Sequence, residues 1–474
     1  MRKSIKKILL ISPPLHLDSF KAKHKKGEYP TLGLLHIASY LREKGNYDIK
    51  VIDAYPLRFN IDELINSIID FCPDIIGISI MTSNYINAFE FIRKLKETTG
   101  ILIVVGGPQA TAFPEFTIKQ CPQIDFLIAG AGEINFYKLV LDINNNSNNY
   151  ETIPRIYYEN NISLSGGHYE KLDLNQLPLP AYDLIELNDF TPYFYEHKTK
   201  PTVSMITSRS CPYSKCSYCF SASRLQEKYV RQSPEKLVDN IRKLYNQFKI
   251  KQITFMDDVF LASPKWIEKF CYLLKNENTN IKWSCRTRIS TITEDVIKKI
   301  KDVGCWRIII GFESGVQELL DIINKGVTVE KAEKAIKTIQ KEKLSIAGYF
   351  MLGLPKETPE KAKQTIEFAI RNNLDYAQFS LTRIVEGTKL YDIYHKYGKK
   401  INKEKQKQVE GVFLPTVGFL PYGYKDEKEL EEMMRLAHWR FYFRLRYIIK
   451  IVKELNSIEN IRRYIALFRV FLRI

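Results

Sequence analysis

The sequence predicts two successive α/β domains and a C-terminal helical segment: a doubly wound parallel sheet first, then a partial (β/α)6 barrel. Apolar strand-like runs alternate with helical patterns in two series, a polar run at 143–149 separates the series, and glycine or polar residues follow most strand candidates. Such residues gather at one edge of a parallel sheet, where ligands bind. We therefore expect domains at 1–145 and 201–390, a linker region at 146–200 and a helical region at 391–474.

The first series predicts a parallel sheet covered by helices on both faces, because its strand candidates are continuously apolar. Its loops with room for a ligand are 12–32, 79–84, 106–111 and 130–133. The strand candidates are 7–12, 49–53, 75–80, 101–105 and 126–129, and the helix candidates are 32–44, 61–71 and 88–97.

The second series contains six βα units, which fit an open or partial barrel with its active site at the C-terminal ends of the strands. Polar or glycine signals stand at five of those ends. The strand candidates are 203–207, 252–255, 281–285, 307–311, 347–352 and 376–381, and the helix candidates are 234–247, 264–274, 294–303, 329–342 and 359–372.

Composition narrows the cellular setting. A hydrophobic fraction of 45% is ordinary for a globular protein. The apolar run 8–11 is too short for a signal peptide, and no run approaches the roughly 20 apolar residues of a membrane span. We expect a cytoplasmic protein. The net charge of +17 is spread along a lysine-rich chain, so no nucleic-acid partner is expected.

Three of the eight cysteines, Cys211, Cys216 and Cys219, fall within nine residues directly after a strand candidate. Three such thiolates bind either a zinc ion or an iron–sulfur cluster. Zinc usually takes a fourth ligand from a second nearby pair, and the next cysteine, Cys271, lies in an apolar helix. A [4Fe–4S] cluster with one open iron is therefore favoured. The other five cysteines are predicted to be buried and inert.

These motifs resemble the radical S-adenosylmethionine enzymes, in particular the subgroup with an N-terminal cobalamin-binding domain that includes the anaerobic magnesium-protoporphyrin cyclase. The resemblance covers about residues 5–450, although four residues, rather than the usual three, separate Cys211 from Cys216. It implies a Rossmann-like domain, a TIM-like barrel and an electron donor such as flavodoxin or ferredoxin. The motifs that carry it are 30–35, 77–82, 106–111, 130–133, 211–219, 255–258, 286–288, 311–315 and 351–355.

The resemblance also implies residue roles around S-adenosylmethionine. Tyr218 would lie against the adenine, Asp257 or Asp258 would accept hydrogen bonds from the ammonium group, and Arg288 would neutralise the carboxylate. Glu313 and Ser314 would bind the ribose hydroxyls. Simpler interpretations remain open: the aspartates fit a helix N-cap pair, and the arginine fits a surface ion pair.

For cobalamin, the resemblance implies that the protein holds the corrin side chains and the nucleotide tail. His24 sits in a lysine-rich loop and is not expected to bind cobalt. Glycine lets backbone approach a bulky ligand closely. The candidate cobalamin-binding residues are Ser79, Gly106, Gly107, Gln109, Gly132 and Glu133.

The resulting prediction is an enzyme that forms a 5′-deoxyadenosyl radical to methylate, cyclise or rearrange an unactivated carbon of a small-molecule or lipid substrate. The alternatives are a zinc-stabilised nucleic-acid-binding protein and a radical enzyme that has lost cobalamin. A basic amphipathic segment at 458–474 either packs over the barrel or makes a peripheral membrane contact.

Overall fold

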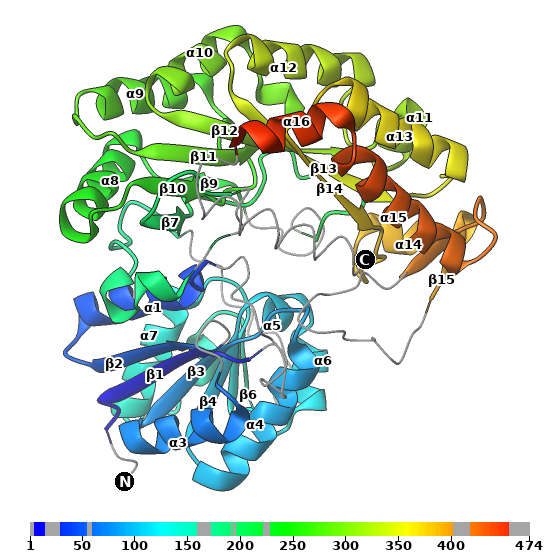
Figure 1. Ribbon diagram of the computed structural model, residues 1–474. Helices are drawn as coiled ribbons and strands as arrows, with labels where there is room; N and C mark the ends of the chain where they lie inside the picture. Colours follow the sequence, from blue (N-terminus) through cyan, green and yellow to red (C-terminus); the bar gives the residue numbers. More distant parts are fainter. Residues whose placement is uncertain are drawn as a thin grey trace. The chain divides into compact units, whose positions relative to one another are not determined.

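The computed structural model describes residues 4–14, 29–54, 59–158, 172–190, 192, 196–220, 228–401 and 418–454, without the side chains of 450–454. The chain divides into two compact units. The first comprises residues 1–193, 201–204 and 230–232, and the second comprises the remainder. The structure contains two six-stranded sheets, which appear in Figure 1. The first sheet lies in the first unit, and five of the six strands of the second sheet lie in the second unit.

The first sheet has the strand order β2-β1-β3-β4-β5-β6 and is parallel except for β6. The strand order reverses direction at β1, as doubly wound sheets do. The five predicted strands are confirmed as β1 to β5, to within one residue at each end. The strand bounds of this sheet are β1 Lys7–Ser12, β2 Asp48–Asp53, β3 Ile75–Ser79, β4 Leu102–Gly106, β5 Phe126–Ile128 and β6 Ile156–Tyr158.

Helices cover both faces of this sheet (Figure 1). The three predicted helices are present as α1, α3 and α4, and α3 begins with a capping box of Asn60 and Glu63. The segments expected as loops after β4 and β5 are instead the beginnings of α5 and α7. The bounds are α1 Leu32–Lys44, α3 Ile61–Phe71, α4 Tyr85–Thr99, α5 Pro108–Ala112, α6 Pro114–Gln120 and α7 Gly132–Asn144.

The first unit extends past the predicted boundary at 145. Strand β6 pairs antiparallel with β5 and covers the sheet edge, with Phe126, Tyr150 and Tyr158 in mutual ring contact. An antiparallel strand needs only a short connection, so part of the region expected as a linker belongs to this sheet.

The second sheet has the order β14-β13-β12-β11-β10-β7, in which neighbours follow the chain sequence. The strand pairs from β10 to β14 are all parallel, as a partial barrel requires. All six predicted strands are confirmed. Their bounds are β7 Thr202–Met205, β10 Gln252–Phe255, β11 Lys282–Thr287, β12 Cys305–Glu313, β13 Ser345–Leu352 and β14 Tyr376–Leu381.

Each of the five predicted helices of this unit begins at a serine or threonine whose hydroxyl accepts a hydrogen bond from the third helical residue's backbone N–H. Such a cap contributes about 1 kcal/mol. In three helices proline follows the cap, where its missing N–H costs nothing. The helices are α8 Pro234–Phe248, α9 Pro264–Lys275, α10 Glu294–Asp302, α12 Val329–Lys341 and α13 Pro359–Arg371.

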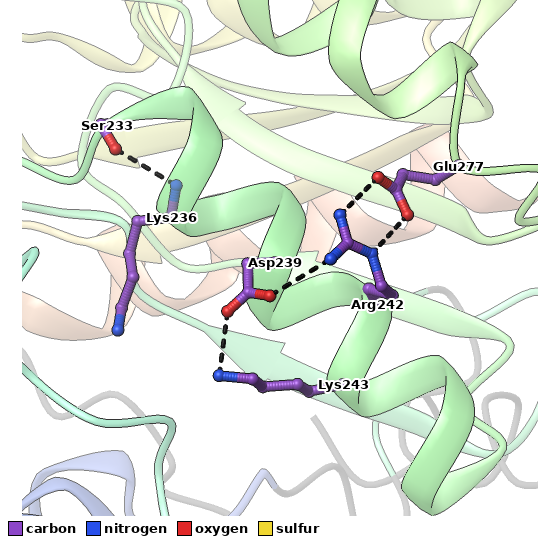
Figure 2. A network of polar contacts seen from close by, with 6 residues as sticks. All are labelled: Ser233, Lys236, Asp239, Arg242, Lys243 and Glu277. Atoms are coloured by element: carbon purple, nitrogen blue, oxygen red, sulfur yellow. Dashed lines mark hydrogen bonds and ion pairs between the residues drawn. The ribbon is translucent and has the colours of Figure 1, made fainter.

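Figure 2 shows how α8 begins and how it is tied to the segment after α9. Ser233 caps the helix at Lys236, and Asp239 pairs with Arg242 and Lys243. Arg242 also makes two 2.7 Å hydrogen bonds to Glu277, whose pKa it lowers. These side chains are largely solvent-exposed, so the network specifies the helix position more than it stabilises the fold.

Aromatic side chains fill the space between the second sheet and its helices. Phe255 and Trp283 pack edge-on against Phe270 of α9. Phe312 and Phe350 stack on each other, and both contact the Phe368 ring of α13 at an angle. Large buried rings supply much of the burial free energy of such a layer.

The predicted C-terminal helical region contains α15 (Glu427–Tyr442) and α16 (Leu445–Glu454). Helix α15 packs on β14: Phe441 and His438 contact the Phe379 ring, and the Tyr442 hydroxyl donates to the Ala377 carbonyl at 2.7 Å. This helix therefore completes the outer layer. The segment 458–474 lies outside the described residues. Among the described helices none is long and apolar enough to cross a bilayer.

Four of the five isolated cysteines are buried, as predicted. Burial raises the pKa of the Cys121 and Cys271 thiols to about 11 and about 12, which keeps them protonated and inert. The expectation was wrong for Cys72, which is exposed and adopts the left-handed conformation that ends α3.

A buried carboxyl group joins the turn after β13 to the C-terminal region. Glu357 is fully buried, and its Oε1 accepts hydrogen bonds from the Gly353 N–H at 2.5 Å and the Tyr424 hydroxyl at 2.8 Å. Its Oε2 has no hydrogen-bond partner in the described part of the chain. Burial raises the pKa of Glu357 to about 7, against the opposing effect of these hydrogen bonds.

This geometry predicts that the Glu357→Gln enzyme gains stability over the wild type as the pH rises from 5 to 8. The protonated carboxyl is favoured in the folded state, so its contribution is full below the unfolded pKa near 4.5 and is lost as the pH rises through about 7. The loss amounts to about 3 kcal/mol. Thermal unfolding at several pH values measures it. The exposed Glu330→Gln is the control, and a pH-independent difference would contradict the prediction.

Candidate functional site

The three clustered cysteines lie in the loop that follows β7. Cys216 is buried, and Cys211 and Cys219 are half-buried. The loop is fixed by the turn after α11 (Gln317–Ile322). Ser217 donates its N–H to the Ile323 carbonyl at 2.9 Å, Tyr213 donates to the Asn324 carbonyl at 3.1 Å, and the Asn324 amide donates back to the carbonyl of residue 215 at 2.9 Å. The cysteine positions are thus set by a segment a hundred residues away.

Asp257 fixes the start of the same loop. Its carboxylate is buried and accepts hydrogen bonds from the Thr207 N–H and hydroxyl, at 3.2 and 2.8 Å, and from the Ser208 hydroxyl. Charge-assisted hydrogen bonds of this kind are about twice as strong as neutral ones. Because these donors occupy the carboxylate, the geometry supports an anchoring role and not the expected contact with an ammonium group.

Arg288 lies beneath the cysteine loop and is buried, which excludes the surface ion pair. Its Nη1 is 3.5 Å from the Cys216 sulfur, its Nη2 donates to the Lys325 carbonyl at 2.6 Å, and its guanidinium stacks 3.8 Å from the Tyr213 ring centre. A cation at this distance offsets part of the negative charge that thiolate ligands bring to a metal site. Arg288 therefore faces the thiol site directly.

Tyr218, Glu313 and Lys325 form a buried polar triad beside the cysteines. Glu313 Oε1 accepts from the Lys325 ammonium at 2.7 Å and from the Tyr218 hydroxyl at 2.8 Å. Burial and the Glu313 carboxylate raise the pKa of Tyr218, so its phenol stays protonated and donates. Glu313 has a positive φ of 65° at an irregularity of β12, and Gly311 leaves the space that its carboxylate occupies.

The two remaining candidate residues of this unit, Ser314 and Asp258, differ in whether the side chain can contact a ligand. The Ser314 hydroxyl is buried and shared between the Thr365 hydroxyl at 3.0 Å and the Val316 N–H at 3.1 Å, so it stabilises a turn. Asp258 is exposed. Partial burial and the Asp257 carboxylate raise the pKa of Asp258, and Arg286 opposes them. Asp258, not Ser314, therefore has a side chain free to meet a ligand.

The thiol site has a donor set that suits an iron–sulfur cluster. A [4Fe–4S] cluster takes thiolate ligands on separate irons. Among the described residues no group of three Cys, His, Asp or Glu is arranged to hold a single metal ion. The donor set, three cysteines beside a buried arginine, is chemically suited to the cluster.

In the first unit, the candidate residues gather at the C-terminal ends of β3, β4 and β5. Gly107 has a φ of +89°, and a Cβ there would stand 2.7 Å from the Ser79 hydroxyl oxygen. Thr111 ties two of the turns together, because its hydroxyl donates to the Gly107 carbonyl at 2.8 Å and accepts from the Gly130 N–H at 2.9 Å. The backbones of these turns therefore approach each other without a side chain between them.

Gln109 is the strongest ligand-binding signal at this edge. It is 2% exposed, and among the residues that the structure describes its Oε1 has no hydrogen-bond partner, which is costly for a buried oxygen. Gly132 and the buried Glu133 begin α7 at the neighbouring turn. An unsatisfied amide beside glycine-lined backbone fits a large ligand rich in amides, such as cobalamin. His24 lies outside the described residues.

Sequence reasoning missed Lys325, Tyr213, Asn324 and Thr207. A lysine is inconspicuous among 71 basic residues, and the contacts of the other three depend on segments far apart in the sequence. One local signal was present: Gly326 follows Lys325 with a φ of +69°, and a Cβ there would collide with the Tyr213 hydroxyl. A glycine at this point thus marks the close approach of the cysteine loop.

Comparison with known proteins gives two family matches: the radical SAM superfamily at residues 205–369 and the B12 binding domain at residues 22–140. An uncharacterized methyltransferase of Pyrococcus horikoshii is 30% identical over 98% of this chain and 99% of its own length. The anaerobic magnesium-protoporphyrin IX monomethyl ester cyclase of Rubrivivax gelatinosus is 26% identical over 79% of this chain and 67% of its own length.

Solved structures agree in fold. OxsB, a cobalamin-dependent S-adenosylmethionine radical enzyme with aqua-cobalamin and S-adenosylmethionine bound, covers 98% of this chain and 71% of its own at a TM-score of 0.72 and 17% identity. TsrM from Kitasatospora setae, with cobalamin and a [4Fe–4S] cluster bound, covers 90% and 81% at a TM-score of 0.65 and 16% identity.

These matches overturn the alternative of a zinc-stabilised nucleic-acid-binding protein, because the cysteine loop lies inside the radical SAM match. They support cobalamin as well as the cluster and S-adenosylmethionine as cofactors, against a loss of cobalamin. The chain is an enzyme that acts on a small molecule and needs a reductant. It belongs to the radical S-adenosylmethionine superfamily, in the group whose members carry a B12-binding domain.

Proposed function

We propose that this enzyme transfers a methyl group to an unactivated carbon of a small-molecule substrate. The observation that carries the proposal is the similarity to a methyltransferase over nearly the full length of both chains, which includes both cofactor-binding regions. When bound, the cluster supplies an electron to S-adenosylmethionine and cobalamin supplies a methyl carrier. The protein's own residues bind, orient and shield these groups.

In this proposal Cys211, Cys216 and Cys219 ligate the cluster, and Arg288 supports them. Arg288 Nη1 lies 3.5 Å from the Cys216 sulfur and brings a positive charge to a site of three thiolates. The guanidinium is itself held by the Lys325 carbonyl and the Tyr213 ring. Arg288 thereby balances charge at the cluster, in addition to the carboxylate contact that the resemblance implies.

Lys325, Glu313, Tyr218 and Asp258 are proposed to surround S-adenosylmethionine. In this arrangement the Lys325 ammonium pairs with the carboxylate of S-adenosylmethionine, and Asp258 accepts a hydrogen bond from the cofactor's ammonium group. The Tyr218 ring lies against the adenine of the cofactor. Glu313 holds Lys325 and Tyr218 in place through its Oε1. A buried ion pair of this kind keeps one geometry, because loss of either partner leaves a buried charge.

In the first unit we propose that Ser79, Gly106, Gly107 and Gln109 hold cobalamin, with Gly132 and Glu133 at the adjacent turn. The unpaired Gln109 Oε1 would accept a hydrogen bond from a corrin amide, and Gly107 would let the backbone approach the ring. No protein ligand to cobalt is proposed. The protein then holds the cofactor through its periphery.

Cyclisation is the second candidate, because the chain is also similar to the magnesium-protoporphyrin cyclase over 79% of its length. We further propose a flavodoxin or ferredoxin as the electron donor. A lipid substrate and a peripheral membrane contact remain hypotheses that depend on the segment 458–474.

The decisive test is anaerobic incubation of the reconstituted enzyme with a strong reductant, cell extract and S-adenosylmethionine deuterated in its methyl group. Methyl transfer predicts 5′-deoxyadenosine together with a product that carries the deuterated methyl group. Formation of 5′-deoxyadenosine with an unlabelled, cyclised product favours the second candidate. Absence of 5′-deoxyadenosine from a fully loaded enzyme contradicts both.

Replacing Cys211, Cys216 and Cys219 together by alanine should abolish cluster absorbance and 5′-deoxyadenosine formation while the fold survives. The half-buried or surface position of two of these side chains leaves the barrel core intact. Iron analysis and circular dichroism measure the two effects. The matched control, Cys72→Ala, removes an exposed thiol from the first unit and should change neither. Full cluster iron in the triple variant would refute the ligand assignment.

Gln109→Leu should weaken cobalamin binding about tenfold, by loss of one hydrogen bond to the corrin periphery. Stability without cofactor should stay equal or rise, since leucine removes a buried oxygen that has no partner. Cobalamin titration by absorbance and thermal unfolding measure these quantities. Gln120→Leu, at the exposed end of α6, is the control. Unchanged affinity in Gln109→Leu would remove this residue from the proposed site.

A further inference from the structure

The two faces of the second sheet differ in exposure. Side chains toward the helices, such as Trp283, Phe350 and Phe379, are at most 1% exposed. Side chains of the opposite parity point into the barrel lumen, because alternate residues of a strand face opposite sides. Several residues of this parity, in three successive rows of the sheet, are only half-buried, so solvent reaches them: Arg286, Gly311, Tyr349, Met351, Gln378 and Ser380.

The sheet register brings several of these residues together. Gly311 pairs with Tyr349, which pairs with Gln378, so these three form one row across β12, β13 and β14. Arg286 of β11 pairs with Ile309, in the row directly below on the same face. In-register residues of parallel strands share a face, so Arg286, Tyr349 and Gln378 face the same part of the lumen.

Arg286 is a cation with unused hydrogen-bonding capacity. Within the described part of the chain its guanidinium makes no ion pair within 4.0 Å and no side-chain hydrogen bond, and its Nε is buried without a partner. Arg288 and Arg307 also each have one buried nitrogen without a partner among the described residues, but their guanidinium groups are otherwise engaged. Arg288 donates to the Lys325 carbonyl and stacks on Tyr213, and Arg307 donates to the Ser345 hydroxyl at 3.0 Å.

Two carboxyl groups, Asp258 and Glu196, lie near Arg286 without forming an ion pair to it within 4.0 Å in the described part of the chain. Burial raises the pKa values of both, and Arg286 opposes this by lowering them. Glu196 is also near Arg307. Tyr349 is a neutral donor, since burial raises its pKa, and Tyr376 occupies the Gln378 Oε1 at 2.8 Å, which leaves the NH₂ of that amide as its donor group.

We propose that Arg286 is a specificity-determining residue that binds a carboxylate or phosphate group of the substrate inside this lumen, with Tyr349 and Gln378 as additional donors. The inference rests on the proposed function and narrows its substrate class to acids. A guanidinium is always charged and matches both groups with two parallel hydrogen bonds. It follows that a neutral hydrocarbon lipid is a poor substrate, whereas an acid of moderate size is a good one.

The test is equilibrium dialysis of the full-length, reconstituted enzyme with radiolabelled pyrophosphate, succinate and S-adenosylmethionine. Arg286→Gln should weaken binding of pyrophosphate, succinate or both by about tenfold or more, and Arg286→Lys should weaken it less. S-adenosylmethionine binding should change less than threefold. The probe that loses more affinity shows whether the site prefers phosphate or carboxylate.

Lys282→Gln is the matched control, because it removes an exposed cation from the same strand and the same face. It should leave binding of both anions within twofold of the wild type. Equal anion binding by wild type and Arg286→Gln would overturn the proposal. A tenfold loss of S-adenosylmethionine binding would also overturn it, by placing Arg286 in the cofactor site. Failure of the proposed function is separately visible, as a wild type that forms no 5′-deoxyadenosine.

Discussion

The catalytic half of this enzyme depends on the docking of one short loop. Residues 211–219 carry all three candidate cluster ligands and contain no helix or strand of useful length. Their position comes from the buried Asp257 carboxylate at the start of the loop and from backbone hydrogen bonds between Ser217 and the turn after α11. Polar groups buried in this way must keep their partners, so the loop has one favourable arrangement.

The same docking also organises the cofactor-binding polar residues. The turn that receives the loop carries Lys325, whose carbonyl holds Arg288 and whose ammonium holds Glu313. Arg288 then reaches the Cys216 sulfur, and Glu313 reaches the Tyr218 hydroxyl. One segment thus links the thiol site to the proposed S-adenosylmethionine site. A substitution in this turn is expected to disturb both, because the groups share partners.

In both units the candidate ligand-binding residues lie at the C-terminal ends of the strands. In parallel sheets the carboxyl ends of the strands meet at one edge, and the loops there are free to vary while the strands keep the core. The first unit shows glycine turns and the unpaired Gln109 at that edge, and the second shows the cysteine loop, Asp257–Asp258 and Glu313. The proposed cobalamin site and the proposed cluster and S-adenosylmethionine site therefore follow the same architectural rule.

The sequence by itself determined most of the strands and helices, because apolar periodicity and serine or threonine caps are local properties. The bounds of β10, β14, α1 and α3 agree with the structure to the residue, whereas α5 and α7 were not predicted. It also identified the cysteine cluster, since the three thiols are adjacent in the chain. Only the tertiary structure decided which polar residues stabilise the fold and which are available to a ligand. Asp257 and Ser314 were expected to face a ligand, but their hydrogen bonds go to Thr207 and Thr365, fifty residues away. Lys325 and Arg286 could be recognised as candidate binding residues only from the neighbours that register and packing give them, because pairing between distant segments leaves no local pattern in the sequence.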